Sequence, residues 1–92
     1  MQNQNKKTAF SSQGTIVSVR GSVIKAYFPY TIPKIYHELR AGDDEEIVIE
    51  VIAHFDAHTI QGIALTTTQG LARGSRVIDT LCRNDYIGIV PG

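Results

Sequence analysis

The stretch at residues 59–74, TIQGIALTTTQGLARG, constrains the fold of this chain more than any other. Its first half is rich in β-branched and aliphatic residues, a composition that favours one long strand. Its second half places Gly70 and Gly74 four residues apart, which is typical of a tight loop whose backbone visits positive φ at both glycines. Leu71 belongs to no periodic element, so we expect its side chain to turn inward and close one end of a core.

Other short apolar runs, separated by turn residues, predict five further strands. The dipeptide Arg20-Gly21 is a candidate hairpin turn between the first two, and Val17 and Val19 share one face of the first. The expected strands cover residues 15–19, 22–28, 47–53, 77–78 and 86–90.

One helical turn is expected, over residues 33–39. Pro33 suits the first position of a helix, and Ile35, Tyr36 and Leu39 recur at helical spacing. Six strands with a single helical turn predict an all-β barrel. The sheet is expected to close on itself, because closure removes the unpaired edges that invite aggregation.

Several expected strands are apolar on more than one face. Ile16, Ile52 and Ile63 cannot easily all point inward together with their neighbours. One explanation is that bulges and irregular twist turn some of these side chains. The other, which we favour, is an outer surface that packs on a partner.

Length and composition exclude several classes of protein. A chain of 92 residues forms one small domain. Nine basic and nine acidic residues give a formal net charge of zero, which argues against a surface dominated by phosphate contacts and hence against a nucleic-acid partner. The single cysteine, Cys82, cannot form an internal disulfide, and neither a signal peptide nor a run long enough for membrane insertion is present. These features predict a soluble cytoplasmic protein, with a mobile tail at residues 1–13 and a barrel domain at residues 14–92.

No segment has the pattern of a catalytic or phosphate-binding site. The nearest stretch to a phosphate-binding loop, residues 70–76, has three residues between its glycines and lacks the lysine that reaches the phosphates. His54, Asp56 and His58 form H-x-D-x-H, but a turn at Asp56 would break the alternation that a metal site needs. We therefore expect no catalysis, cofactor or metal in this chain alone.

Three further polar residues have simple structural interpretations. His37 lies on the expected helical turn and is interpreted as a surface residue. Cys82, in an expected loop, has no activating motif and is interpreted as a space-filling or exposed residue. Arg73, between the two turn glycines, is expected to cap carbonyls of its own loop, the alternative being a carboxylate on an adjacent subunit.

Seven short motifs follow one another along the chain: G-x-I-V-x-V-x-G-x-V at residues 14–23, Phe28-Pro29, PKIY at residues 33–36, IEV at residues 49–51, IAL at residues 63–65, T-x-G-L-x-R-G at residues 68–74 and V-x-D-T at residues 77–80. In this order and spacing they resemble the N-terminal β-barrel (crown) domain of the catalytic β subunit of F-type ATP synthase. The run at residues 56–74 is most similar to the alternate, sodium-type branch of that family. After Thr80 the sequence departs from the family pattern, because LCRNDYIGIVPG is longer and lacks the proline expected there.

The resemblance implies a closed six-stranded antiparallel β-barrel with a structural role. In that family, barrels of alternating α and β subunits form a ring that holds the hexamer together, so α-subunit barrels are the implied partners. The implied structural or interface residues are Gly21, Gly70, Leu71, Arg73, Gly74 and Asp79. The intact subunit of the family synthesises or hydrolyses ATP, coupled to proton or sodium transport, and is peripheral to the membrane. In that subunit the nucleotide-binding domain binds ATP or ADP and Mg. Neither the nucleotide-binding domain nor the C-terminal domain of the family has a counterpart in this sequence.

Two other functions are consistent with particular residues. Tyr27 and Tyr30 lie near Lys25 and Lys34, and aromatic and basic side chains on a small barrel can hold single-stranded nucleic acid. A metal-dependent enzyme centred on H-x-D-x-H is the third hypothesis. The acidic run at residues 43–46 opposes the nucleic-acid hypothesis, because it would repel phosphates.

Overall fold

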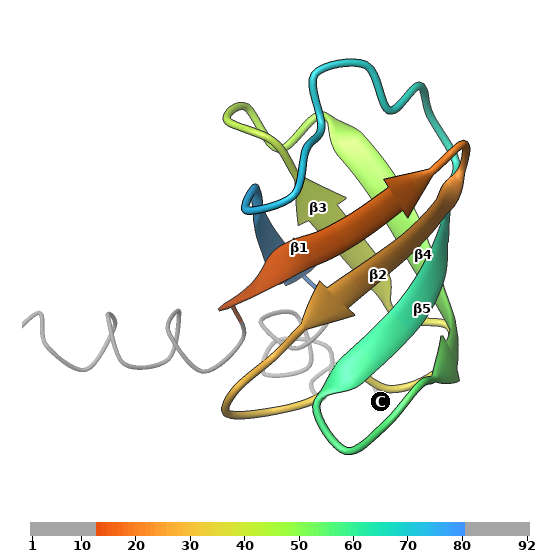
Figure 1. Cartoon of the computed structure of the whole chain (residues 1–92), viewed down its shortest axis with the longest axis vertical. Helices are drawn as coiled ribbons and strands as arrows, with labels where there is room; N and C mark the ends of the chain where they lie inside the picture. Colours follow the sequence, from red (N-terminus) through yellow and green to blue (C-terminus); the bar gives the residue numbers. More distant parts are fainter. Residues whose placement is uncertain (1–12, 81–92) are drawn as a thin grey trace, which may run out of the picture.

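Six antiparallel strands close into a barrel in the computed structural model, which describes residues 13–80 (Figure 1). Around the barrel the strand order is β1-β2-β5-β4-β3-β6. The strands are β1 (Gln13–Arg20), β2 (Val23–Tyr27), β3 (Glu38–Ala41), β4 (Ile47–His54), β5 (Thr59–Ala64) and β6 (Arg76–Asp79). The all-β class and the closed six-stranded antiparallel barrel are thus confirmed. Among residues 13–80, no helix is long and apolar enough to cross a membrane.

The predicted helical turn is wrong, because that part of the chain contributes strand β3. Only a turn at Ile35 and Tyr36 precedes the strand, and Tyr36 has a φ of 73°, which a right-handed helix cannot contain. Leu39 and Ala41 are both fully buried, so the inward face follows the alternation of a strand. Pairing with β4 on one side and β6 on the other overrides the helical spacing. The sixth strand predicted at residues 86–90 lies outside the described residues.

The barrel interior is filled by aliphatic side chains and one aromatic ring. The core residues with no exposed surface are Ile16, Ile24, Ala26, Phe28, Leu39, Ala41, Ile49, Val51, Ile60 and Val77. Gly62 lies among them on β5, where a Cβ atom would be 2.6 Å from Cγ2 of Ile49 and 2.9 Å from the Glu50 carbonyl oxygen. The strands β4 and β5 can approach this closely only because residue 62 has no side chain.

Two β-bulges decide which apolar residues face outward. The register shifts between Ile16 and Ser18 on β1, and between Val51 and Ala53 on β4. Ile16 is fully buried and Ile52 is 39% exposed, while Ile63 is half-buried on the outer face. The first bulge also separates Val17 from Val19, which packs against the core, so the prediction that they share one face is wrong. Bulges therefore explain part of the two-sided apolar pattern, and an apolar outer surface remains.

The loop from β5 to β6 closes one end of the barrel. Gly70 and Gly74 have φ values of 89° and 94°, as predicted from their spacing. Leu71 between them is only 9% exposed and belongs to the core cluster. The amides of Leu71 and Gly74 donate hydrogen bonds to the carbonyls of Thr68 (2.9 Å) and Ile16 (2.8 Å). The inward orientation predicted for Leu71 is confirmed.

The turn between β4 and β5 is organised by the Asp56 carboxylate. Its Oδ1 atom accepts hydrogen bonds from the amides of His58 (2.9 Å) and Thr59 (2.8 Å). The bond from the His58 amide is the main reason that the pKa of Asp56 lies below its ordinary value of 3.8. The Asp56 carboxylate stabilises this turn because its oxygen accepts hydrogen bonds from backbone amides, as a backbone carbonyl would in another type of turn.

We expect Leu71→Ala to lower the free energy of unfolding by about 2–4 kcal/mol, because it removes buried methyl groups and leaves a cavity at the barrel end. Leu65→Ala is the matched control, since Leu65 is 60% exposed on the same loop. Urea unfolding followed by circular dichroism measures both. Equal losses in the two variants would contradict the role assigned to Leu71.

We expect the Asp56 carboxylate to make stability depend on pH in acid. Because the folded pKa is lower than the unfolded one, its contribution is complete above pH 3.8 and disappears as the pH falls through the folded pKa. Asp56→Asn keeps a side-chain acceptor and should flatten this part of the pH profile of the unfolding free energy. Asp56→Ala should lower stability even at neutral pH. An unchanged acid slope in Asp56→Asn would refute this explanation.

Candidate functional site

An apolar surface on the outside of β4 and β5 is the clearest candidate for an interaction site. It consists of Val48, Ile52, Ile63 and Leu65, here called the β4–β5 patch. Ile52 and Leu65 are 39% and 60% exposed, and Val48 and Ile63 are half-buried. Val48 on β4 and Leu65, which directly follows β5, lie side by side, since the Leu65 amide donates to the Val48 carbonyl at 2.8 Å, and Glu50 on the same face pairs with Ile63. Exposing these side chains to water is unfavourable, so the patch is suited to contact with another protein.

Aromatic side chains gather at the opposite end of the barrel from the Leu71 loop. The rings of Tyr27 and His58 lie 5.7 Å apart, and Nζ of Lys25 lies 3.9 Å from the centre of the Phe55 ring. Tyr27 and Phe55 are 42% and 59% exposed. Both contacts are already made within the barrel, the second as a cation–π interaction.

The residues of the H-x-D-x-H motif have separate partners. Nε2 of His54 donates to the Pro33 carbonyl at 2.7 Å, and Nδ1 of His58 donates to the Phe28 carbonyl at 3.2 Å. Asp56 accepts from the turn amides. Within residues 13–80 no group of three histidine, cysteine, aspartate or glutamate side chains could hold a metal ion. The motif therefore serves the β4–β5 turn and its contacts with the β2–β3 connection.

A buried pair of side chains, His37 and Asp79, was not predicted from the sequence. Nδ1 of His37 donates to the Asp79 carboxylate, whose oxygens lie 3.0 and 3.1 Å away. The two side chains are 13% and 3% exposed, so the interpretation of His37 as a surface residue is wrong. Beside them, the Thr80 hydroxyl donates to the Glu38 carbonyl at 2.8 Å. Asp79 thus fixes the end of β6 to the start of β3.

The other residues implied by the resemblance lie in exposed turns. Gly21 has a φ of 61° in the β1–β2 hairpin, and Gly70, Arg73 and Gly74 are exposed in the loop before β6. No hydrogen bond joins the Arg73 side chain to its own loop in the described part of the chain, so the local capping that we expected is not seen. The structure brings Leu71 into the core but leaves these four residues at the surface.

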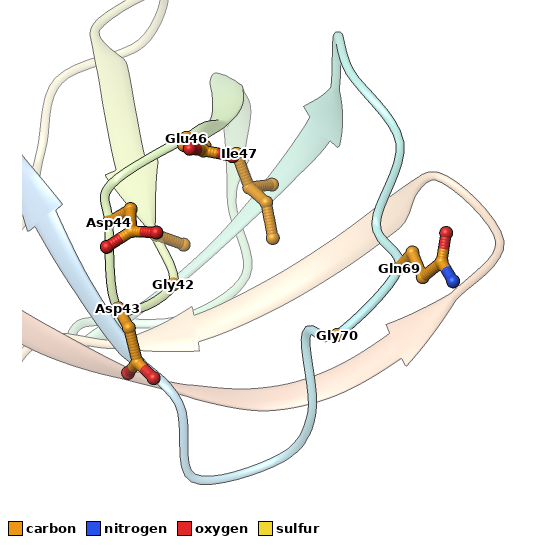
Figure 2. Close-up of a pocket in the computed structure, with 8 residues that line it drawn as sticks. Gly42, Asp43, Asp44, Glu46, Ile47, Gln69 and Gly70 are labelled. Carbon is orange, nitrogen blue, oxygen red and sulfur yellow. The ribbon is translucent and has the colours of Figure 1, made fainter.

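A hollow of about 180 Å³ separates the acidic β3–β4 loop from the segment at Gln69 and Gly70 (Figure 2). In Figure 2 the Ile47 side chain points into the space between the two segments, while the Gln69 amide points away from it. Asp43, Asp44 and Glu46 line its acidic side. A site bordered by carboxylates repels phosphate groups, so this hollow does not suit a nucleotide.

The segment that most resembles a phosphate-binding loop does not fit one. After Gly74 the chain enters strand β6, whereas a phosphate-binding loop leads into a helix whose N-terminal amides hold the anion. The described residues therefore offer no cradle for ATP, and no step of ATP chemistry is assigned to them.

Comparison with known proteins agrees with this geometry. Residues 16–80 match the β-barrel domain of the ATP synthase alpha/beta family. Similar proteins include ATP synthase subunit beta 2 of Polaromonas naphthalenivorans, 52% identical over 73% of this chain, and that of Shewanella frigidimarina, 42% identical over 83%. ATP synthase subunit beta of Acaryochloris marina is 50% identical over 63%.

The chain spans only a small part of the length of these relatives. The aligned region is 14%, 16% and 13% of the length of these three relatives. The family match over residues 16–80 nevertheless includes most of the residues that form the six strands, and it confirms the resemblance to the β-barrel domain of this family. The chain belongs to the ATP synthase alpha/beta family, and residues 16–80 are the β-barrel domain of that family.

Proposed function

We propose that this chain is the N-terminal assembly barrel of an ATP synthase β subunit, which packs against neighbouring α-subunit barrels and holds a hexameric ring together without taking part in catalysis. The observation that carries the proposal is the β4–β5 patch. Its side chains lie on the outside of a closed sheet, where burial would require another protein. Burying apolar area contributes about 25 cal/mol per Å², so covering four aliphatic side chains stabilises a contact appreciably.

The residues implied by the resemblance divide into two groups under this proposal. Leu71 and Asp79, both buried, hold the barrel in shape so that the patch is presented by a rigid surface. Gly21, Gly70 and Gly74 form the turns at one end. Arg73 is exposed there, and a carboxylate of a neighbouring subunit is its proposed partner.

The activity of the intact protein is also part of the proposal. The relatives are named ATP synthase subunit beta, and this supports ATP synthesis or hydrolysis by the whole subunit, with ATP or ADP and Mg bound outside the barrel. Coupling to proton or sodium transport, the sodium-type branch and a peripheral place at the membrane are proposed on the same basis. The tail at residues 1–13 and the barrel domain at residues 14–92 complete the proposed domain organisation.

A small barrel that binds single-stranded nucleic acid is the alternative. In its favour, Tyr27 and Tyr30 are 42% and 67% exposed, and Lys25 lies close to Phe55. Against it, Lys25 already contacts the Phe55 ring and Tyr27 already contacts the His58 ring of the same barrel. The net charge of zero also provides little attraction for phosphates. A salt-dependent shift in the mobility of single-stranded DNA or RNA would favour this alternative over the assembly module.

We expect Ile52→Asp to weaken association with the α-subunit barrel of the same enzyme by about tenfold or more, because it places a charge in an apolar contact. Ile35→Asp is the matched control, since Ile35 is 37% exposed and Ile52 is 39% exposed, and Ile35 lies in the β2–β3 connection. The two barrels are co-expressed, and their affinity is measured by titration calorimetry. Thermal unfolding of each variant shows whether the fold is intact. An equal effect of both substitutions, or no association of the unsubstituted chains at high concentration, would refute the proposal.

A further inference from the structure

The β4–β5 patch continues beyond β5 onto β2 and β1. Val23 on β2 pairs with Ile63 of the patch, and both side chains are half-buried on the outside of the barrel. Next to Val23 lies an open hollow of about 570 Å³, lined by Val17, Ser18, Arg20, Val23, Lys25 and Gln61. Lys25 is already engaged there, because its Nζ atom lies 3.9 Å from the centre of the Phe55 ring. The patch and the hollow therefore form one outer surface.

One row of paired residues crosses this surface over four neighbouring strands, in the order β1, β2, β5, β4 (Figure 1). Arg20 on β1 pairs with Val23 on β2, which pairs with Ile63 on β5. Ile63 pairs in turn with Glu50 on β4. Directly paired residues place their side chains on the same face of a sheet, so two aliphatic side chains lie between a cation and a carboxylate. Arg20 and Glu50 are separated by three strand spacings, about 14 Å around the barrel.

The two charges at the edges of this row are not neutralised by the barrel. Within residues 13–80 no ion pair joins Arg20 or Glu50 to another side chain. On the far side of β4, Glu50 pairs with Glu38 of β3, and like charges in directly opposite positions are unfavourable. The cation of this region is already used, because Nε of Arg40 donates to the Glu38 carboxylate at 2.8 Å. Glu50 therefore gains more than an ordinary surface carboxylate from a cation supplied by a partner.

We propose that the contact surface of this barrel spans all four strands, and that Arg20 and Glu50 at its two edges select the partner and fix its orientation. The partner is the α-subunit barrel, so this inference rests on the proposed function and specifies the chemistry of its contact. The complementary surface has an aliphatic centre, a carboxylate opposite Arg20 and a lysine or arginine opposite Glu50. A barrel with the wrong charges, or one turned the wrong way round, would place like charges together. Charges at the edge of an apolar contact govern specificity and the rate of association more than affinity.

Reversing the charge of Arg20 tests the β1 edge of the surface. At low ionic strength Arg20→Glu should weaken association with the α-subunit barrel of the same enzyme by about fivefold or more, because it turns an attraction into a repulsion. Arg76→Glu is the matched control, since Arg76 is also exposed but lies on β6, outside the row. Titration calorimetry measures both variants at low and at high ionic strength, and salt should reduce the difference between them. Equal effects, or a difference that salt does not reduce, would overturn the inference.

Neutralising Glu50 separates a role in binding from a role in the fold. Glu50→Gln removes the like charge that faces Glu38, so the Tm of the free chain should not fall. Its affinity for the α-subunit barrel should nevertheless fall by about two- to fivefold at low ionic strength. Glu46→Gln is the matched control, because Glu46 is an exposed carboxylate of the β3–β4 loop outside the row, and it should leave the affinity unchanged. A lower Tm that accompanies the loss of affinity, or equal affinities of the two variants, would contradict the role assigned to Glu50.

The same measurements distinguish failure of this inference from failure of the proposed function. If Ile52→Asp weakens binding of the α-subunit barrel while the Arg20 and Glu50 variants match their controls, the assembly role stands and only the charged row fails. If the unsubstituted chain does not bind that barrel at all, both fail. The row is also complementary to itself under a two-fold rotation, so sedimentation velocity of the chain alone completes the test. Self-association as tight as the association with the α-subunit barrel would overturn the choice of partner.

Discussion

Closure of the barrel depends on the short strand β3. Its residues pair with β4 on one edge and with β6 on the other, so four residues complete the sheet. Leu39 and Ala41 fill the interior at the same place. Without this strand β4 and β6 would be exposed edges, which proteins generally avoid because unpaired strands invite association. The remaining strands could pair as before, but their inner faces would be open to water.

The sequence predicted the class of fold better than it predicted this strand. The runs of β-branched and aliphatic residues along β4 and β5 are local signals of strands. The spacing of Gly70 and Gly74 around Leu71 likewise describes a loop whose conformation hardly depends on distant residues. By contrast, β3 is short, and Ile35, Tyr36 and Leu39 fall by chance at helical spacing. The conformation of β3 is decided by its pairing with β4 and β6, which lie farther along the sequence. The local strand or helix propensity of a segment carries no information about such partners.

The same limit applies to the polar contacts of the candidate site. His37 and Asp79 are 42 positions apart, and nothing local distinguishes this histidine from a surface one. The apolar residues on two faces of β4 were visible in the sequence, and they predicted an outer contact surface. The bulge that exposes Ile52 could not be seen in the sequence, because a bulge is a property of the register between two strands.

The buried polar pair also joins the end of β6 to the segment that leads into β3. Asp79 is almost completely buried at the end of β6, and Thr80 donates to the Glu38 carbonyl, so the last described residues are held by β3 and by His37. A charged or polar group at this depth is costly unless it is well hydrogen-bonded, which makes the geometry here specific. The end of β6 is therefore held in place by contacts with the closing strand and with His37.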